Sequence, residues 1–240
     1  MEIALSVDSL SADIGQFSIL RDVSFQVPVG SVTVLLGRNG AGKTTTLRTL
    51  MGFIPIKSGS VQLFGRPLGQ LPPHRVQKAG VAYVPEDNNI FSNLTVEENL
   101  RLAAGRGPLP RDGLEYVLAL FPDLRQAYNR LGGTLSGGQR QMLAIASVLM
   151  ARPKVLLIDE PTKGLSPLFV EKLVTVIQEL GRSVTVLLVE QNLYLAEQTG
   201  TYYVVLDDGK SIAKGPVHEL REDKELQQRA LGIRVAVEED

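Results

Sequence analysis

A glycine-rich stretch at residues 37–45 constrains the fold of this chain more than any other segment. It follows a β-branched run at 31–36 and precedes a segment with helical spacing at 43–52. A strand that enters such a loop and leaves it as a helix is the setting of a phosphate-binding loop, because glycines let several backbone N–H groups point inward at the helix start. The pattern therefore predicts a strand, loop and helix that cradle a polyphosphate. The residues predicted to bind it are Gly37, Arg38, Asn39, Gly40, Ala41, Gly42, Lys43, Thr44 and Thr45.

Three side chains of this loop have predicted roles. Lys43 is expected to reach the β and γ phosphates, and the hydroxyl of Thr44 is expected to ligate Mg²⁺. Thr45 follows directly and can donate to the α phosphate. These roles make Lys43 a candidate catalytic residue as well as a binding residue.

Short β-branched runs alternate with helical stretches along much of the chain. The runs lie at 31–36, 81–85, 155–159, 184–190 and 202–206, and the helical stretches lie at 43–52, 137–151 and 167–180. Such alternation predicts an α/β fold with a mostly parallel sheet and helices on both faces. Residues 3–27 alternate in the manner of a small antiparallel sheet.

The middle of the chain has a different texture. No convincing strand follows Val84 until about residue 154, whereas 95–104, 113–121 and 137–151 have helical spacing. Thr95 and Glu98 fit a capping box, in which each side chain accepts from a backbone N–H of the other. We therefore predict a single domain at 1–240, with a core at 1–86 and 155–240 and an inserted helical subdomain at 87–154. Residues 235–240 are expected to fray.

Composition excludes several classes of function. The net charge of −1 offers no concentrated basic surface for nucleic acid. The absence of cysteine removes disulfides, zinc–thiolate clusters and thiol nucleophiles. The first residues lack the pattern of a secretory signal, and no run approaches the roughly 18 apolar residues that span a bilayer. At a membrane, such a chain is expected to dock onto another polypeptide.

A second element of nucleotide chemistry lies at residues 155–160. This apolar run ends in Asp159 and Glu160. At the tip of a buried strand, Asp159 is expected to hold the metal, and Glu160 is expected to act as general base towards the attacking water.

Residues 135–139 read Leu-Ser-Gly-Gly-Gln, a pentapeptide that chance places in a chain of this length about once in ten thousand times. With the glycine loop and the acidic strand end, this motif resembles the ATP-binding subunits of ABC transporters over essentially the whole chain. The resemblance implies a RecA-like P-loop NTPase fold that uses ATP and Mg²⁺. It also implies a head-to-tail dimer, in which Ser136, Gly137, Gly138 and Gln139 close on nucleotide held by the other subunit. Free N–H groups at a helix start suit that role.

Flanking segments narrow the resemblance. Residues 38–42, 83–86, 91–100 and 188–192 look like those of branched-chain amino-acid importer ATPases, with the urea and short-amide importers as the alternative. In the latter, Gln is typical at the position of Glu86. The resemblance implies a peripheral subunit at the cytoplasmic face of the plasma membrane, with permease subunits as partners and, indirectly, a solute-binding protein. Nucleic acid is not expected.

The chain lacks the features of two other classes of ABC protein. Chromosome-maintenance relatives need long heptad arms, and translation-factor relatives carry two cassettes, whereas this chain has neither. A nucleotide-binding regulatory subunit with little turnover remains as an alternative.

Several positions depart from the family pattern. Glu86 stands where a glutamine is usual; it can still bind Mg²⁺ or orient water, but it adds negative charge beside phosphates. Gln191 replaces the switch histidine, so it can hydrogen-bond a phosphate but cannot carry a proton there. Ser166 replaces an aspartate, and Ile14 stands where an adenine-stacking tyrosine is common, with Phe17 as a substitute. Together they predict slower hydrolysis at this chain's own loop and a dimer with a different ATPase subunit, although a homodimer stays possible.

Overall fold

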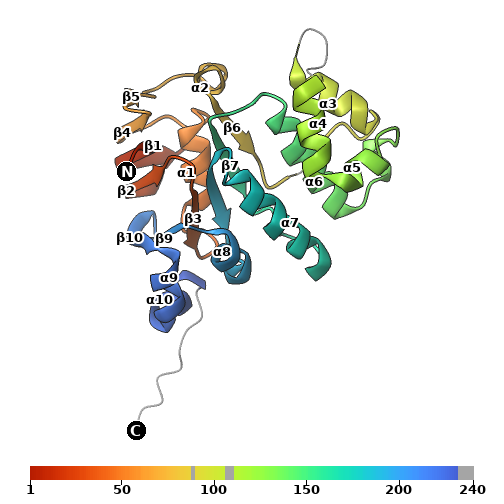
Figure 1. Ribbon diagram of the computed structural model, residues 1–240. Coiled ribbons are helices and arrows are strands. Elements are labelled where there is room, and N and C mark those ends of the chain that lie inside the picture. Colours follow the sequence, from red (N-terminus) through yellow and green to blue (C-terminus); the bar gives the residue numbers. More distant parts are fainter. Residues whose placement is uncertain (88–89, 106–110, 232–240) are drawn as a thin grey trace.

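The computed structural model describes residues 1–87, 90–105 and 111–231. Part of the predicted helix break at 105–110 and the end at 235–240 therefore lie outside the described residues. The described strands form one ten-stranded sheet in the order β5-β4-β1-β2-β10-β9-β3-β8-β7-β6 (Figure 1).

The predicted parallel strands form one side of this sheet. Their bounds are β3 Val32–Gly37, β6 Val81–Val84, β7 Val155–Asp159, β8 Thr185–Glu190 and β9 Tyr202–Asp207. Strand β3 lies between β8 and β9 and runs parallel to both. Strands β8, β7 and β6 continue the parallel array to the edge. The α/β prediction is confirmed, since parallel neighbours joined through helices are what the alternation required.

The other side of the sheet is mostly antiparallel. It contains β1 Ile3–Ile14, β2 Phe17–Pro28, β4 Ser58–Leu63, β5 Arg66–Pro67 and β10 Lys210–Pro216. Strands β1 and β2 pair antiparallel, as predicted for residues 3–27, and β4 pairs with the other edge of β1. Strand β10 links the two halves, because it pairs antiparallel with β9 and parallel with β2.

The bounds of the helices are α1 Lys43–Leu50, α2 Pro73–Ala79, α3 Val96–Ala104, α4 Arg111–Leu120, α5 Pro122–Gln126, α6 Gly137–Leu149, α7 Pro167–Leu180, α8 Leu193–Thr199, α9 Val217–Glu222 and α10 Lys224–Leu231. The helices predicted at 43–52, 95–104, 113–121, 137–151 and 167–180 correspond to α1, α3, α4, α6 and α7, whereas the sequence did not predict α2, α5, α8, α9 and α10. A short 3₁₀ turn lies at Gly132–Thr134. The capping box at α3 is confirmed, since Glu98 N–H donates to Thr95 Oγ1 at 3.1 Å and Thr95 N–H donates to Glu98 Oε2 at 2.7 Å.

Two apolar cores cover the two faces of the sheet. Alternate residues of β3 divide between them: Val34 and Leu36 join the core that includes α6 and α7, whereas Leu35 joins the core under α1. Side chains of one strand point to opposite faces, so a fully buried strand needs apolar residues on both. The site described below lies where these strands end between the two cores.

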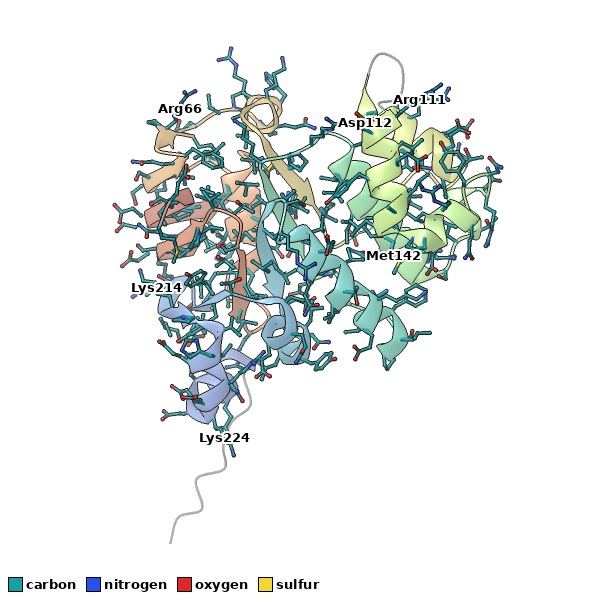
Figure 2. All side chains as sticks on the ribbon, in the orientation of Figure 1. Arg66, Arg111, Asp112, Met142, Lys214 and Lys224 are labelled. Carbon is teal, nitrogen blue, oxygen red and sulfur yellow. The ribbon has the colours of Figure 1, made fainter. Side chains whose placement is uncertain are left out.

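Helices α3 to α6 gather on one side of the molecule, beyond β6 (Figure 1). Between β6 and β7 the described residues contain helices, the 3₁₀ turn and one isolated bridge, but no further strand. Figure 2 shows Arg111 and Asp112 at the outer end of α4, far from Lys214 and Lys224 at the opposite end of the molecule. Within the described residues, no helix is long and apolar enough to cross a bilayer.

Candidate functional site

The glycine loop lies between β3 and α1, as the sequence predicts. Strand β3 is buried along its whole length, so its carboxyl end, where the loop begins, is held firmly. Gly42 precedes α1 with φ 101°, and a Cβ there would lie 2.8 Å from Leu20 Cδ2. Gly40 also has a positive φ, 83°. These backbone conformations and this close approach favour glycine, which lets the loop fold tightly over the start of α1.

The Lys43 side chain is folded into this loop. Its ammonium group donates to the carbonyl oxygens of Gly37 at 2.9 Å and Arg38 at 3.1 Å. It also pairs with Glu160 Oε1 at 3.1 Å, and its side chain is only 4% exposed. The loop thus holds a buried cation beside the backbone N–H groups of a helix start, which is an anion-binding arrangement.

Asp159 lies at the tip of β7 and is fully buried. Its Oδ1 accepts from Thr44 Oγ1 at 3.1 Å, and its Oδ2 accepts from Tyr83 OH at 3.0 Å. Burial raises the pKa of Asp159, an effect opposed by these two hydroxyl donors. The sequence predicted no role for Tyr83 in the site, although it belongs to the predicted 81–85 run; the structure shows that this strand, β6, lies next to β7.

This donor set fits a magnesium ion. A buried carboxylate is normally paired with a cation or a metal, and the partners of Asp159 here are two hydroxyls. Among the described residues, no group of three or more His, Asp or Glu side chains is arranged to hold a metal ion by itself. Mg²⁺ does not need one, because it is usually held by one or two carboxylates together with phosphates and water.

Glu160 joins three parts of the site. Besides the contact with Lys43, its Oε1 accepts from Gln191 Nε2 at 2.7 Å. The same Gln191 nitrogen donates to Asn39 Oδ1 at 2.6 Å. The glycine loop, the end of β7 and the end of β8 therefore meet at one carboxylate. Glu160 has φ 43°, a left-handed conformation that is uncommon outside glycine and often found at functional sites.

A second buried carboxylate, Glu190, holds the adjoining loops and was missed by the sequence reasoning. It is 1% exposed. Thr162 donates to it through its backbone N–H at 3.1 Å and its hydroxyl at 3.0 Å. The backbone N–H groups of Gln191 and Asn192 donate to it at 3.0 Å each. The signal in the sequence was an acid that ends the buried run at 184–190, directly before Gln191.

The carboxylate of Glu86 is paired with a lysine at the rim of the site. Its Oε1 accepts a hydrogen bond from the ammonium group of Lys163, with which it forms an ion pair. This contact raises the pKa of Lys163. The sequence reasoning did not single out Lys163, which lies on the loop after β7.

A cavity of about 300 Å³ lies over the glycine loop. Residues from the loop and from three other segments line it: Ile19, Asn39, Gly40, Gly42, Lys43, Thr44, Thr45, Glu86, Glu160 and Lys163. Ile19 lines the cavity from β2. Ile14 and Phe17 instead lie at the tip of the β1–β2 hairpin, where they are 47% and 65% exposed.

The signature residues are placed on a different element. Ser136 caps α6: its Oγ accepts from Gln139 N–H at 3.2 Å, and Gln139 Oε1 accepts from Ser136 N–H at 3.1 Å. An added Cβ at Gly137 would meet nothing within 4 Å, whereas at Gly138 it would lie 2.1 Å from Phe169 Cδ1. None of the four residues Ser136 to Gln139 lines the cavity over the glycine loop. Ser166 caps α7 without a side-chain hydrogen bond.

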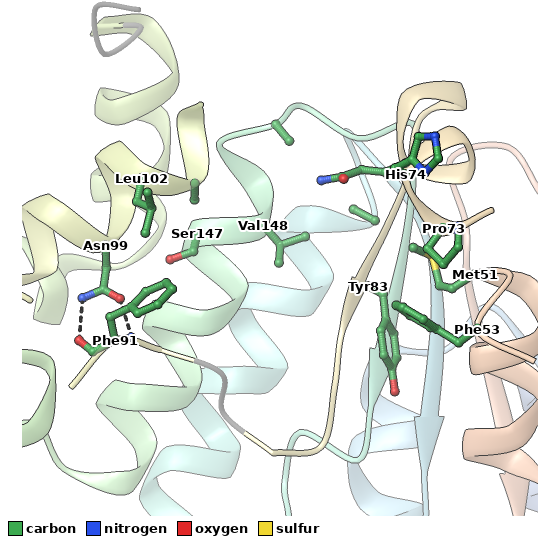
Figure 3. Close-up of a pocket in the computed structure, with 14 residues that line it drawn as sticks. Met51, Phe53, Pro73, His74, Tyr83, Phe91, Asn99, Leu102, Ser147 and Val148 are labelled. Carbon is green, nitrogen blue, oxygen red and sulfur yellow. Dashed lines mark hydrogen bonds between the residues drawn. The ribbon is translucent and has the colours of Figure 1, made fainter. Parts of the chain in front are cut away.

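A larger groove of about 710 Å³ opens between α2 and the helices α3 and α6 (Figure 3). Tyr83 and Phe53 stand on its sheet side, with ring centroids 6.2 Å apart. On the opposite side, Asn99 is tied to the backbone of Phe91 through two hydrogen bonds, at 2.8 and 3.0 Å. Because the Tyr83 hydroxyl also donates to Asp159, this one side chain connects the groove with the site at the glycine loop.

Known proteins share both the sequence and the fold. The family model described as ABC transporter matches residues 20–163. A probable branched-chain amino acid transport ATP-binding protein LivF of Archaeoglobus fulgidus is 40% identical over 228 residues, covering 93% of this chain and 97% of that protein. The high-affinity branched-chain amino acid transport ATP-binding protein BraG of Pseudomonas aeruginosa is 42% identical over 213 residues, covering 87% and 91%.

Solved structures agree with this similarity. The ADP conformation of MJ1267, an ATP-binding cassette of an ABC transporter, superposes with a TM-score of 0.83 at 26% identity, covering 97% of this chain and 99% of that one. CbiO1 of Clostridium perfringens, part of the transporter complex cbiONQ, gives a TM-score of 0.84 at 25% identity, covering 94% and 93%. The chain therefore belongs to the ABC transporter family, as one of its ATP-binding and ATP-hydrolysing subunits.

Proposed function

We propose that this chain is the ATPase subunit of an importer for branched-chain or other hydrophobic amino acids. The observation that carries the ATPase part is the meeting of Lys43, Glu160 and Gln191 over the glycine loop. The two relatives named for branched-chain amino acid transport, at 40% and 42% identity, support the solute class. Glu86 favours this class over the urea and short-amide importers.

The residues divide the chemistry between them. The backbone N–H groups of the glycine loop and Lys43 bind the phosphates, and Thr45 lies beside them in the cavity wall. Glu160 is the general base: it takes a proton from the attacking water, whose oxygen bonds to the terminal phosphorus. The bond from that phosphorus to the oxygen bridging it to the β phosphate breaks in the same reaction, and ADP leaves with that oxygen. Gln191 orients Glu160 through the hydrogen bond at 2.7 Å. Because Lys43 pairs with Glu160, phosphate that draws Lys43 away also frees the carboxylate for its role as base.

Thr44 and Asp159 are the proposed holders of Mg²⁺, with Glu86 as a third oxygen donor nearby. When bound there, the ion would neutralise negative charge on the phosphates. Thr44 and Asp159 are already joined by a hydrogen bond of 3.1 Å, so their oxygens converge. Glu86 is engaged by Lys163 in this structure and would have to share its carboxylate.

The signature residues are proposed to serve a second ATPase subunit. The N–H groups at the start of α6 lie on the helical subdomain proposed at 87–154, away from this chain's own loop. A partner in head-to-tail orientation would bring them to nucleotide bound elsewhere. We propose that the partner is a different ABC ATPase. Gln191 and Ser166 stand where the family usually has a histidine and an aspartate, and a second subunit could carry those two residues at its own site.

The membrane partners are proposed to be permease subunits that dock in the groove lined by Tyr83, Phe53 and Phe91. The relatives are named as ATP-binding proteins of transport systems. The described part of this chain contains no helix that could span a bilayer. Phe53 and Phe91 are 52% and 55% exposed at the groove, which gives a partner apolar side chains to cover. With permease subunits as partners, we propose that the chain works at the cytoplasmic face of the membrane, with a solute-binding protein as an indirect partner.

The direct test is phosphate release by the assembled transporter, with this subunit carrying either Glu160 or Glu160→Gln. We expect a loss of roughly a hundredfold or more in the rate at this site, while ATP binding is retained. Asp112→Asn, at the outer end of α4, is the control and should leave the rate unchanged. No loss with Glu160→Gln would favour a regulatory subunit with little turnover.

The solute class has its own test. Vesicles that contain the whole transporter, with its solute-binding protein, should take up leucine in an ATP-dependent manner. Uptake of urea or acetamide without leucine uptake would overturn the assignment while leaving the ATPase activity intact.

A further inference from the structure

The negative charge of Glu86 has a specific counterpart in the structure. Glu86 lies two residues beyond the end of β6, and Lys163 lies on the loop that follows β7. Strands β6 and β7 are parallel neighbours, with Val84 opposite Ile158, so both loops leave the sheet at the same edge. The Lys163 ammonium group donates to Glu86 Oε1 across this edge.

The backbone around Lys163 is held in place independently of that ion pair. Lys163 N–H donates to the carbonyl of Glu160 at 3.2 Å, and the preceding Thr162 is bound to buried Glu190 through two hydrogen bonds. The loop is therefore held by groups at the carboxyl ends of both β7 and β8. Lys163 starts from a fixed backbone position, and its side chain extends towards Glu86.

The ion pair lies on the wall of the nucleotide cavity. Glu86 and Lys163 line the same space as Lys43, Thr44 and Glu160. The carboxylates Glu86 and Glu160 line this cavity, and Asp159 and Asp87 line the adjoining one together with Glu86. The cations that line these two cavities are Lys43 and Lys163 in the first and Arg48 in the second, so loss of Lys163 would leave the carboxylates further in excess. A polyphosphate brings several more negative charges to the same place, and like charges at short range oppose its binding.

We propose that Lys163 is a second lysine of the ATP site, which neutralises Glu86 and so makes a glutamate at this position compatible with bound phosphates. The proposal rests on ATP binding at the glycine loop. The pair is half-exposed, with side-chain exposures of 34% for Glu86 and 66% for Lys163, so it adds little to the stability of the fold. Its effect is on the charge that the incoming ligand meets.

The test is a double-mutant cycle at residues 86 and 163, in which the affinity of the full chain for a fluorescent ATP analogue is measured. Lys163→Gln should weaken binding roughly threefold to tenfold at low salt, and Lys163→Arg should keep it near the wild-type value. Adding Glu86→Gln to Lys163→Gln should restore most of the lost affinity. Measurement in EDTA as well as in Mg²⁺ separates this charge effect from any role of Glu86 as a metal ligand.

Two controls make the outcome specific. Lys172→Gln removes a similarly exposed ion pair, with Asp123, outside the cavity and should leave ATP affinity unchanged. Raising the salt to about 0.5 M should shrink the effect of Lys163→Gln, because exposed charges are then screened. Melting temperatures of all variants should stay close to that of the wild type.

The results separate this proposal from the proposed function. If the wild-type chain binds ATP and Lys163→Gln binds it equally well, the role of Lys163 is overturned. It is also overturned if the double variant binds no better than Lys163→Gln. Failure of the wild-type chain to bind ATP would instead contradict the ATPase assignment itself.

Discussion

Tyr83 links the carboxylate of Asp159 to the edge of the groove. Its hydroxyl donates to Asp159 Oδ2 at 3.0 Å, and its ring packs against Phe53. Burial, together with the negative charge of Asp159, raises the pKa of Tyr83, so the phenol stays protonated and can act as a donor. It holds the carboxylate in the orientation in which Oδ1 faces Thr44.

Tyr83→Phe removes only this hydroxyl. We expect ATP affinity in Mg²⁺ to fall about threefold to tenfold, because a hydrogen bond to a charged group is lost, while affinity in EDTA stays unchanged. Titration of a fluorescent ATP analogue under both conditions measures the difference. Tyr116→Phe, which removes a surface hydroxyl that contacts Ser183, is the control. An equal loss in both buffers would rule out a role through Asp159.

Glu190 is a residue whose removal should affect stability first. It accepts four hydrogen bonds from Thr162, Gln191 and Asn192. A glutamine in its place would turn its NH₂ group towards some of these N–H and O–H donors, and those hydrogen bonds would be lost. Glu190→Gln should lower the free energy of unfolding by about 1–3 kcal/mol at neutral pH. Glu222→Gln, a change at an exposed residue at the end of α9, should alter it little. Denaturant unfolding measures both, and equal midpoints would contradict the structural role.

The same residue predicts a pH dependence. Burial raises the pKa of Glu190 above its ordinary value of 4.5, an effect opposed by its four donors. An acid with a higher pKa in the folded chain binds more protons there, so its contribution is fully present below the unfolded pKa and is lost as pH rises through the folded one. The stability of the wild type relative to Glu190→Gln should therefore be greatest near pH 4 and should decline above it. A difference that grows with pH would contradict this sign.

At the level of elements, α6 shows that neighbouring glycines can serve different purposes. Gly138 lies against the ring of Phe169 on α7, so its lack of a side chain allows α6 and α7 to pack closely. Gly137 faces open space at the first turn of the same helix. The first glycine is thus available for a ligand, whereas the second is required by the fold.

This difference predicts opposite effects for two alanine substitutions. Gly138→Ala should lower stability by about 1–3 kcal/mol, because the methyl group overpacks against Phe169. Gly137→Ala should leave stability unchanged or slightly raised, yet it should reduce ATP hydrolysis by the assembled dimer, since the methyl group obstructs the N–H groups of the helix start. Thermal unfolding and phosphate release measure the two effects. A stable Gly138→Ala or a fully active Gly137→Ala would each refute the corresponding assignment.

The elements that the sequence predicts have clear local hydrophobic patterns, whereas the elements that it does not predict, such as β4, lack them. Strand β7 and helix α7 have the bounds that hydrophobic spacing predicts, because both bury continuous or periodic apolar residues. Strand β4 reads Ser-Gly-Ser-Val-Gln-Leu, a sequence with weak strand propensity. It is a strand because it pairs with β1 along its length, and pairing of that kind is a tertiary interaction.

For the molecule as a whole, the separation of the signature from the glycine loop predicts its assembly. The Glu160→Gln variant is used so that ATP is hydrolysed slowly. In ATP, this variant should remain monomeric when it is alone, and it should form a dimer when the second ATPase subunit of its transporter is added. Light scattering with and without ATP measures the mass. A stable and fully active homodimer would contradict the proposed heteromeric pairing.

The sequence by itself determined the α/β class, the glycine loop and the membership suggested by the signature, because these depend on local chemistry at fixed spacing. It also placed Asp159 and Glu160 at a strand end. Only the tertiary structure decided which side chains meet there. Tyr83, Lys163 and Glu190 come from separate segments, and parallel strands bring their ends to one sheet edge through contacts that are far apart in sequence. Hydrophobic patterning encodes burial, whereas it does not encode which polar groups lie opposite one another across strands.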